Sequence, residues 1–184
     1  DFNADGRPDV AIANQGSASV SILLGNGSGG LGPKTDFTTA ADPFSVTSGD
    51  FNADGNLDLA VANIGSDSVS ILLGNGSGGF GTRTDFATGT VPFSVVSEDF
   101  NADGRPDLAV ANFGSTSVSI LLGNGAGGFG AKTDFTTGTA PTSVASEDFN
   151  ADGRPDLAVA NGGSTSVSIL LGNGSGGFGT KTDF

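Results

Sequence analysis

The stretch Asp99-Phe-Asn-Ala-Asp-Gly-Arg-Pro-Asp107 (DFNADGRPD) recurs along this chain of 184 residues, as DFNADGRPD at 1, DFNADGNLD at 50 and DFNADGRPD at 148. The four copies start at Asp1, Asp50, Asp99 and Asp148, so each copy follows the previous one after 49 residues. Repeats of about 20–50 residues indicate an array in which each unit is one supersecondary module packed against its neighbours. The repeat therefore decides the fold before any single residue is considered.

The repetition extends over the whole chain. The units are residues 1–49, 50–98, 99–147 and 148–184, of which the last is incomplete. From Asp99 and from Asp148 onward, the last two units match over 37 residues with three differences. No atypical unit stands at either end, and the chain begins with Asp and contains no Met. We therefore expect it to be a processed or excerpted part of a longer array.

One unit, residues 43–86, has the pattern of a small antiparallel sheet. Short runs with alternating apolar residues, PFSVTSG, LDLAVAN, SVSILLGN and TRTDFAT, are separated by Gly, Asn, Asp and Ser. This alternation predicts four strands, and no stretch has the 3.6-residue period of a helix. We expect Val69, Ile71 and Leu73 on one face, and Ala60 and Ala62, together with Leu72, on the other.

A sheet that is partly apolar on both faces must stack on similar sheets, which predicts an all-β propeller-type array of four-stranded blades. The predicted blades are approximately 1–37, 43–86, 92–135 and 141–184. The first unit lacks the strand that precedes the other three loops, so the chain should have 15 strands. We expect that strand to come from sequence outside 1–184 or from a neighbouring molecule. A closed four-blade monomer is the alternative.

Composition argues against several classes of protein. The chain has 20 acidic and 7 basic residues, a formal charge of −13, and no Cys, His, Met, Trp or Tyr. Because phosphate contacts require a basic surface, a nucleic-acid partner is not expected. No apolar run approaches the roughly 20 residues of a membrane span. Without Cys there are no disulfides, so stability must come from packing and from bound metal.

The repeated nonapeptide has the spacing of a calcium loop. Asp1, Asn3 and Asp5 alternate, Gly6 allows a sharp bend, and the carbonyl of residue 7 and the acid at 9 complete an oxygen-rich set of the kind Ca²⁺ prefers. We predict one Ca²⁺ in each of the four loops. The predicted ligands are Asp1, Asn3, Asp5, Arg7, Asp9; Asp50, Asn52, Asp54, Asn56, Asp58; Asp99, Asn101, Asp103, Arg105, Asp107; Asp148, Asn150, Asp152, Arg154 and Asp156, with residue 7 of each set acting through its carbonyl.

Two other interpretations of the loop are less satisfactory. An EF-hand needs a bidentate Glu at position 12, where this chain has Ile12, Val61, Val110 and Val159, and it needs flanking helices. A plain Asx turn needs only one Asp, whereas three carboxylates held close together repel by about 1 kcal/mol per pair even in water. Four complete copies of the set therefore favour metal binding.

The unit DFNADGRPDLAVAN…SVSILLGNGSGGFG resembles the FG-GAP/VCBS repeat family, which includes the blades of the integrin α-subunit propeller. The resemblance covers the whole chain and includes the GGFG turn at residues 78–81. It implies a β-propeller with Ca²⁺ between the first and second strands of each blade, and an extracellular, secreted or cell-surface role in adhesion or structure. The resemblance also implies a protein or glycan ligand.

Other functions stay open at this point. Sugar binding, as in lectins with similar repeats, is the alternative binding role. An enzyme is not expected, because several acids outside the loops share one position that recurs in every unit (Asp36, Asp85, Asp134, Asp183), whereas catalytic sites are usually singular. Asn26, Asn75 and Asn173 fit the N-glycosylation triplet, but Ala126 interrupts it in the third unit, so a turn role explains all four copies better.

Overall fold

The computed structural model describes all 184 residues and confirms an all-β fold of four antiparallel sheets. One helical element is present, the 3-10 turn η1 (Gln15–Ser17), and no helix has the length and apolar character needed to cross a bilayer. The strands are β1 (Val10–Asn14), β2 (Ser19–Leu23), β3 (Thr35–Thr38), β4 (Pro43–Gly49), β5 (Asp58–Asn63), β6 (Ser68–Leu72), β7 (Thr84–Ala87), β8 (Pro92–Glu98), β9 (Asp107–Asn112), β10 (Ser117–Leu121), β11 (Thr133–Thr136), β12 (Pro141–Glu147), β13 (Asp156–Asn161), β14 (Ser166–Leu170) and β15 (Thr182–Asp183).

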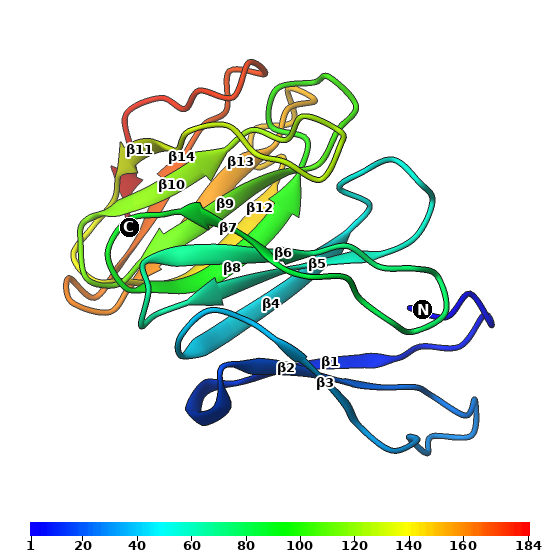
Figure 1. Ribbon diagram of the computed structural model, residues 1–184. Helices are drawn as coiled ribbons and strands as arrows, with labels where there is room; N and C mark the ends of the chain where they lie inside the picture. The colour runs from blue at the N-terminus through cyan, green and yellow to red at the C-terminus, as the bar shows by residue number, and fades with distance from the viewer.

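Each sheet is formed by strands that follow one another in the chain. The orders are β1-β2-β3, β4-β5-β6-β7, β8-β9-β10-β11 and β12-β13-β14-β15, and we call these sheets with their loops blades 1 to 4. Blade 1 has three strands because no strand pairs with the free edge of β1. Figure 1 shows the blades side by side in chain order, from blue blade 1 to orange and red blade 4, as an open array.

The register of β5 and β6 corrects one expectation about the faces of the blade. Ala60 lies opposite Ile71 and Ala62 lies opposite Val69. Residues directly opposite in an antiparallel pair point to the same face. The expectation that the two alanines lie on the face opposite Val69 and Ile71 is therefore wrong. All four side chains share one face, where the small alanines leave room for the neighbouring blade.

Both faces of an inner blade are buried against neighbours. One face of blade 2 packs on blade 3, where Ala60 and Val69 join a core cluster with Leu108 and Leu121. The other face packs on blade 1, where Leu59, Val61 and Leu72 contact Phe2, Val20 and Ile22. These apolar layers between blades supply the hydrophobic core, which an isolated sheet of this size would lack.

A chain of hydrogen bonds between an Asn, a Ser and an Asp side chain recurs in the blades, and we call it the polar ladder. Asn63 Nδ2 donates to Ser70 Oγ (2.9 Å), and Ser70 Oγ donates to Asp85 Oδ1 (2.7 Å). The main-chain amide of Ala40, from the preceding blade, donates to the same Ser70 Oγ (3.1 Å). Equivalent ladders centre on Ser119 and on Ser168. The recurring acids outside the loops are therefore acceptors for these serines, which is a structural role.

The Asn-Gly turns use their Asn side chains internally. Asn75 Oδ1 accepts hydrogen bonds from the amides of Ser77 (2.9 Å) and Gly79 (3.1 Å). Asn124 makes the same two bonds although Ala126 replaces the serine. The amide oxygen thus closes the turn in units with and without a glycosylation triplet, which supports the turn role.

Candidate metal centre

The repeated nonapeptide lies where the first strand of a blade connects to the second, between β4 and β5 in blade 2. Asp50 accepts hydrogen bonds from the main-chain amides of Asp54 (3.1 Å) and Gly55 (2.9 Å). Asn52 Nδ2 donates to Asp54 Oδ2 (2.9 Å), and Asp54 Oδ1 accepts from the amide of Asn56 (2.8 Å). The side chains at positions 1, 3 and 5 of the loop are therefore folded back toward one another.

The loop keeps this shape through two residues with positive φ. Ala53 has φ 58° and Gly55 has φ 83°. The left-handed region costs an alanine roughly 1–2 kcal/mol, whereas glycine enters it freely, as predicted for the sixth position. Alanine holds this conformation in all four loops. The hydrogen bonds of Asp50 to the surrounding amides offset that cost.

The ninth residue of the loop has a role that the sequence analysis missed. Asp58 is fully buried, and its two oxygens accept hydrogen bonds from the amides of Phe51 (2.8 Å) and Gly74 (2.7 Å). Asp107 is buried in the same way and binds the amides of Phe100 (3.0 Å) and Gly123 (2.8 Å). This carboxylate therefore joins the start of the loop to the next hairpin of the same blade. The only sequence signal for this structural role was the presence of an acid where the second strand of the blade begins.

The acids of one loop titrate differently. Burial, together with the smaller effect of the Asp103 and Asp99 charges, raises the pKa of Asp107 to about 6, against the lowering effect of its two amide donors. Burial likewise raises the pKa of Asp58. In contrast, the amide of Asn56 lowers the pKa of the exposed Asp54. A cation in the loop would relieve the repulsion that these carboxylates share.

The donor chemistry fits a hard cation such as Ca²⁺. The exposed oxygens at positions 1, 3 and 5 and the carbonyl at position 7 are oxygen donors of the types Ca²⁺ takes, with water completing the usual six to eight ligands. Across the structure, no three acidic side chains converge closely enough to hold a metal ion by themselves. The amide oxygen of the Asn and the backbone would therefore have to contribute. The ninth residue accepts one amide hydrogen bond at each of its two oxygens, and each oxygen keeps a further lone pair that a cation could use.

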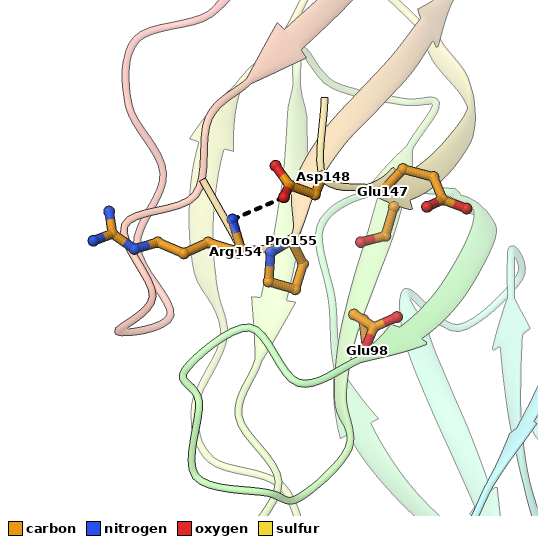
Figure 2. Close-up of a pocket in the computed structure, with 7 residues that line it drawn as sticks. Glu98, Glu147, Asp148, Arg154 and Pro155 are labelled. Carbon is orange, nitrogen blue, oxygen red and sulfur yellow. Dashed lines mark hydrogen bonds between the residues drawn. The ribbon is translucent and has the colours of Figure 1, made fainter. Parts of the chain in front are cut away.

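A small acidic pocket adjoins the fourth loop. It has a volume of about 250 Å³ and is lined by Glu98, Glu147, Asp148, Arg154 and Pro155, with Ser146 and Gly153. Figure 2 shows the Arg154 side chain directed away from Glu98 and Glu147. A similar pocket of about 320 Å³ lies beside the third loop. The two glutamates end the neighbouring strands β8 and β12, so they add negative charge close to the loops.

Comparison with protein-family models gives matches over nearly the whole chain. The FG-GAP-like repeat model matches residues 1–61, 50–110 and 99–159, and the FG-GAP repeat model matches residues 140–180. Each match to the first model begins at the first residue of a loop and ends inside the second strand of the following blade. No curated protein matches the chain significantly.

Several solved structures share the fold. A lectin of Agrocybe aegerita that recognises non-reducing terminal N-acetylglucosamine superposes with a TM-score of 0.69 at 22% identity, over 100% of this chain and 50% of its own. BBS1N in complex with ARL6DN gives 0.67 at 17% identity, over 100% and 54%. A protein of Desulfotomaculum acetoxidans gives 0.65 at 14% identity, over 95% and 55%. The chain therefore spans about half the length of these structures.

Proposed function

Because this chain belongs to the FG-GAP-like repeat family, we propose that it is a calcium-binding β-propeller module that serves outside the cell as an adhesion or structural scaffold. One Ca²⁺ occupies each of the four loops, held by the residues at positions 1, 3, 5, 7 and 9, with residue 7 acting through its carbonyl. We propose no catalytic role for the chain. Its partners are a protein or glycan ligand and further blades of its own kind.

The observation that carries this proposal is the arrangement of the loops. Each loop brings two solvent-accessible acids and an Asn together above a third acid, and three of those third acids, Asp58, Asp107 and Asp156, are fully buried. Arg7, Arg105 and Arg154 approach the neighbouring acid only to 3.8–3.9 Å and are themselves about half exposed. Such exposed pairs neutralise little charge. A bound cation does so directly, and four of them would change the net charge from −13 to −13 + 8 = −5.

The kind of site supports the proposed extracellular location. Open loops of this type, with few buried ligands, suit the weak calcium sites of extracellular modules, whose Kd is about 10⁻⁴–10⁻³ M. Cytosolic calcium is far too dilute to fill such sites. A module outside the cell would carry its calcium constantly, and the ion would act as a structural component of the blade.

Thermal unfolding in calcium and in chelator tests this function. A ligand that binds only the folded state stabilises it by RT ln(1 + [L]/Kd), about 2.7 kcal/mol per site at a hundredfold excess over Kd. We expect the melting temperature to fall by many degrees in EDTA and to recover with Ca²⁺. Equal melting temperatures in the two buffers at low ionic strength would rule out a structural calcium site.

The free edge of β1 supports assembly through a donated strand. In blades 2 to 4 the equivalent edge is covered by β4, β8 or β12, whereas β1 pairs only with β2. A groove of about 300 Å³ beside β1 is lined by Phe2, Ala11, Val46 and Leu59. Unpaired edges attract further strands. A strand of the PFSVVSE type, from another segment of a longer parent or from a neighbouring molecule, would complete blade 1.

A peptide experiment tests the donated strand. A labelled peptide with the sequence of residues 90–98 should bind the chain and protect the amides of β1 from hydrogen exchange. A scrambled peptide of the same composition is the control. Equal exchange of the β1 amides with both peptides would contradict the donated strand without affecting the calcium proposal.

Sugar binding is a second candidate function, favoured by a row of exposed aromatic rings. Phe93 lies 3.9 Å from Phe44 and 5.2 Å from Phe113, centroid to centroid, and Phe44 and Phe113 are both exposed. Flat apolar rings offer a surface for the C–H face of a sugar. Binding to immobilised glycans that is lost in Phe113→Ser would support this role, and the absence of binding to any glycan would exclude it.

A further inference from the structure

The three contacts between neighbouring blades are built from the same parts. In each contact, one blade contributes two Phe side chains, the one at loop position 2 and the one in its outer strand. The Phe of the next blade's glycine turn packs between these two rings. At the first contact, Phe80 lies 5.6 Å from Phe2 and 5.3 Å from Phe37, edge to face. The amide of Gly78 also donates to the carbonyl oxygen of Phe2 (2.8 Å).

A leucine completes each contact by lying over the glycine turn. A Cβ atom placed on Gly78 would be 3.1 Å from Leu24 Cδ2 of the preceding blade. The same arrangement recurs at Gly127 with Leu73 and at Gly176 with Leu122, each at 2.9 Å. Glycine, which adopts the positive φ of this turn without strain, also leaves room for the leucine. Each contact has a donor face, carrying the Phe pair and the Leu, and an acceptor face, carrying the glycine turn.

Blade 4 leaves its donor face uncovered. Phe149 is 48% exposed, whereas its equivalents Phe51 and Phe100 are 2% exposed. Leu171 is 45% exposed and Phe184 79% exposed. The carbonyl oxygen of Phe149 also has no main-chain partner within the chain, unlike the carbonyls of Phe2, Phe51 and Phe100.

Blade 1 leaves its acceptor face uncovered. A Cβ atom placed on Gly29, the equivalent of Gly78, would meet no atom within 4 Å. Leu31 stands at the Phe80 position and is 49% exposed. Beside it is a groove of about 450 Å³ lined by Pro8, Val10, Leu31 and the glycines of the turn. This groove lies where an internal blade receives the aromatic pair of its neighbour.

We propose that the donor face of blade 4 binds the acceptor face of blade 1 of a second copy of this chain. Phe149 and Phe184 would enclose Leu31 of the second copy, Leu171 would lie over its Gly29, and the Gly29 amide would donate to the Phe149 carbonyl. The occupant is a second copy because the contact continues an interface that the chain already makes three times between nearly identical units. This inference goes beyond the proposed calcium function and rests on the packing of the blades.

The contact is heterologous, since different surfaces of the two copies meet. Head-to-tail contacts of this kind close into a ring when the rotation between copies allows it, and otherwise extend into a filament. The similarity to structures about twice as long favours a ring that contains two chains. Each copy carries a formal charge of −13, so salt and bound calcium should strengthen the association by screening repulsion.

Two substitutions block one face each without touching the interior. Leu171→Glu places a charge on the donor face and Leu31→Glu places one on the acceptor face, both at exposed positions. Thr116→Glu is the control, because Thr116 is exposed but lies on neither face. Sedimentation velocity in calcium, from about 1 to 300 μM, should show concentration-dependent assembly of the wild-type chain and of Thr116→Glu. Each blocked variant alone should sediment as a monomer.

Mixing the two blocked variants gives the sharpest result. The Leu171→Glu copy retains an acceptor face and the Leu31→Glu copy retains a donor face, so an equimolar mixture should form a 1:1 dimer and nothing larger.

Leu31→Phe, which restores the residue of the internal turns, should lower the concentration for half-assembly about tenfold. A wild-type chain that is monomeric throughout the range, or blocked variants that assemble like the wild type, would overturn the proposal. Calcium stoichiometry measured on the same samples should be unchanged by Leu171→Glu, so this proposal and the calcium proposal can fail separately.

Discussion

The main-chain amide of Gly127 donates a hydrogen bond to the carbonyl oxygen of Phe51 across the boundary between blades 2 and 3, with an N···O distance of 2.8 Å. Phe51 is the second residue of a candidate metal loop, and Gly127 belongs to the glycine turn of the next blade. The same loop thus carries both the proposed ligands of a cation and the aromatic side chain that packs between blades. A cation that orders the loop would also order the contact with the next blade.

Removing the side chain of a proposed exposed ligand should act mainly through calcium. Asp103→Ala removes the carboxylate of the fifth residue of the third loop, a side chain that is about one third exposed. In saturating Ca²⁺ we expect a loss of about 2.7 kcal/mol in unfolding free energy, the contribution of one site at a hundredfold excess over Kd. In EDTA the loss should be under about 1 kcal/mol. Urea unfolding in both buffers measures the difference, and equal losses would show that Asp103 is not a ligand.

The buried acid of the same loop should behave differently. Asp107→Ala leaves the amides of Phe100 and Gly123 without their acceptor. An unsatisfied buried donor costs about 1–3 kcal/mol, so the variant should lose stability in EDTA as well as in Ca²⁺. Asp107→Asn retains one acceptor oxygen and should lose about half as much. A variant destabilised only in the presence of calcium would contradict the structural role of Asp107.

The polar ladder offers a test of blade-to-blade coupling. Ser119 Oγ donates to Asp134, and it accepts from Asn112 Nδ2 and from the amide of Gly89 in the preceding blade. Ser119→Ala should cost about 1–2 kcal/mol, since the Gly89 amide loses its acceptor and Asn112 Nδ2 keeps only its bonds to Ser117. Thr116→Ala, an exposed substitution in the turn before the same strand, should change stability by less than about 0.5 kcal/mol. Similar chemical-denaturation midpoints for the two variants would argue against the ladder.

The aromatic contact between blades can be compared within one chain. Phe129 lies 5.5 Å from both Phe51 and Phe86, edge to face. Phe129→Leu recreates the residue that blade 1 has at position 31 and should remove about 1–3 kcal/mol, from two aromatic pairs at about 0.5–1.5 kcal/mol each. Differential scanning calorimetry should show a lower melting temperature. A melting temperature equal to that of the wild type would mean that the ring geometry contributes nothing beyond its volume.

The repeat and the alternating strands were sufficient to predict the sheets and the position of the loops. Both signals are local, because a period of 49 residues and an alternation of two can be counted directly along the sequence. The orientation of Ala60 and Ala62 was predicted wrongly because alternation along one strand does not show which residues of the neighbouring strand lie on the same face. Which residues share a face depends on the register of β5 against β6, and that register is set by the turn between Asn63 and Ser68.

The roles of Asp58 and Asp85 could not be read from the sequence. Both are acids in a chain rich in acids, and their partners, the Gly74 amide and Ser70 Oγ, are 16 and 15 residues away along the chain. Only the folded hairpins bring these atoms together. The exposure of Phe149 likewise follows from its position in the last blade, since its sequence surroundings match those of Phe100.

Calorimetric titration of the metal-free chain with Ca²⁺ tests the central claim most directly, because it counts the sites. We expect four Ca²⁺ bound per chain, one per loop, and three in the Asp103→Ala variant. Mg²⁺ should bind more weakly, since it requires a smaller and more regular octahedron of ligands. A titration with no binding at millimolar Ca²⁺, or with a stoichiometry unrelated to the number of intact loops, would contradict the account.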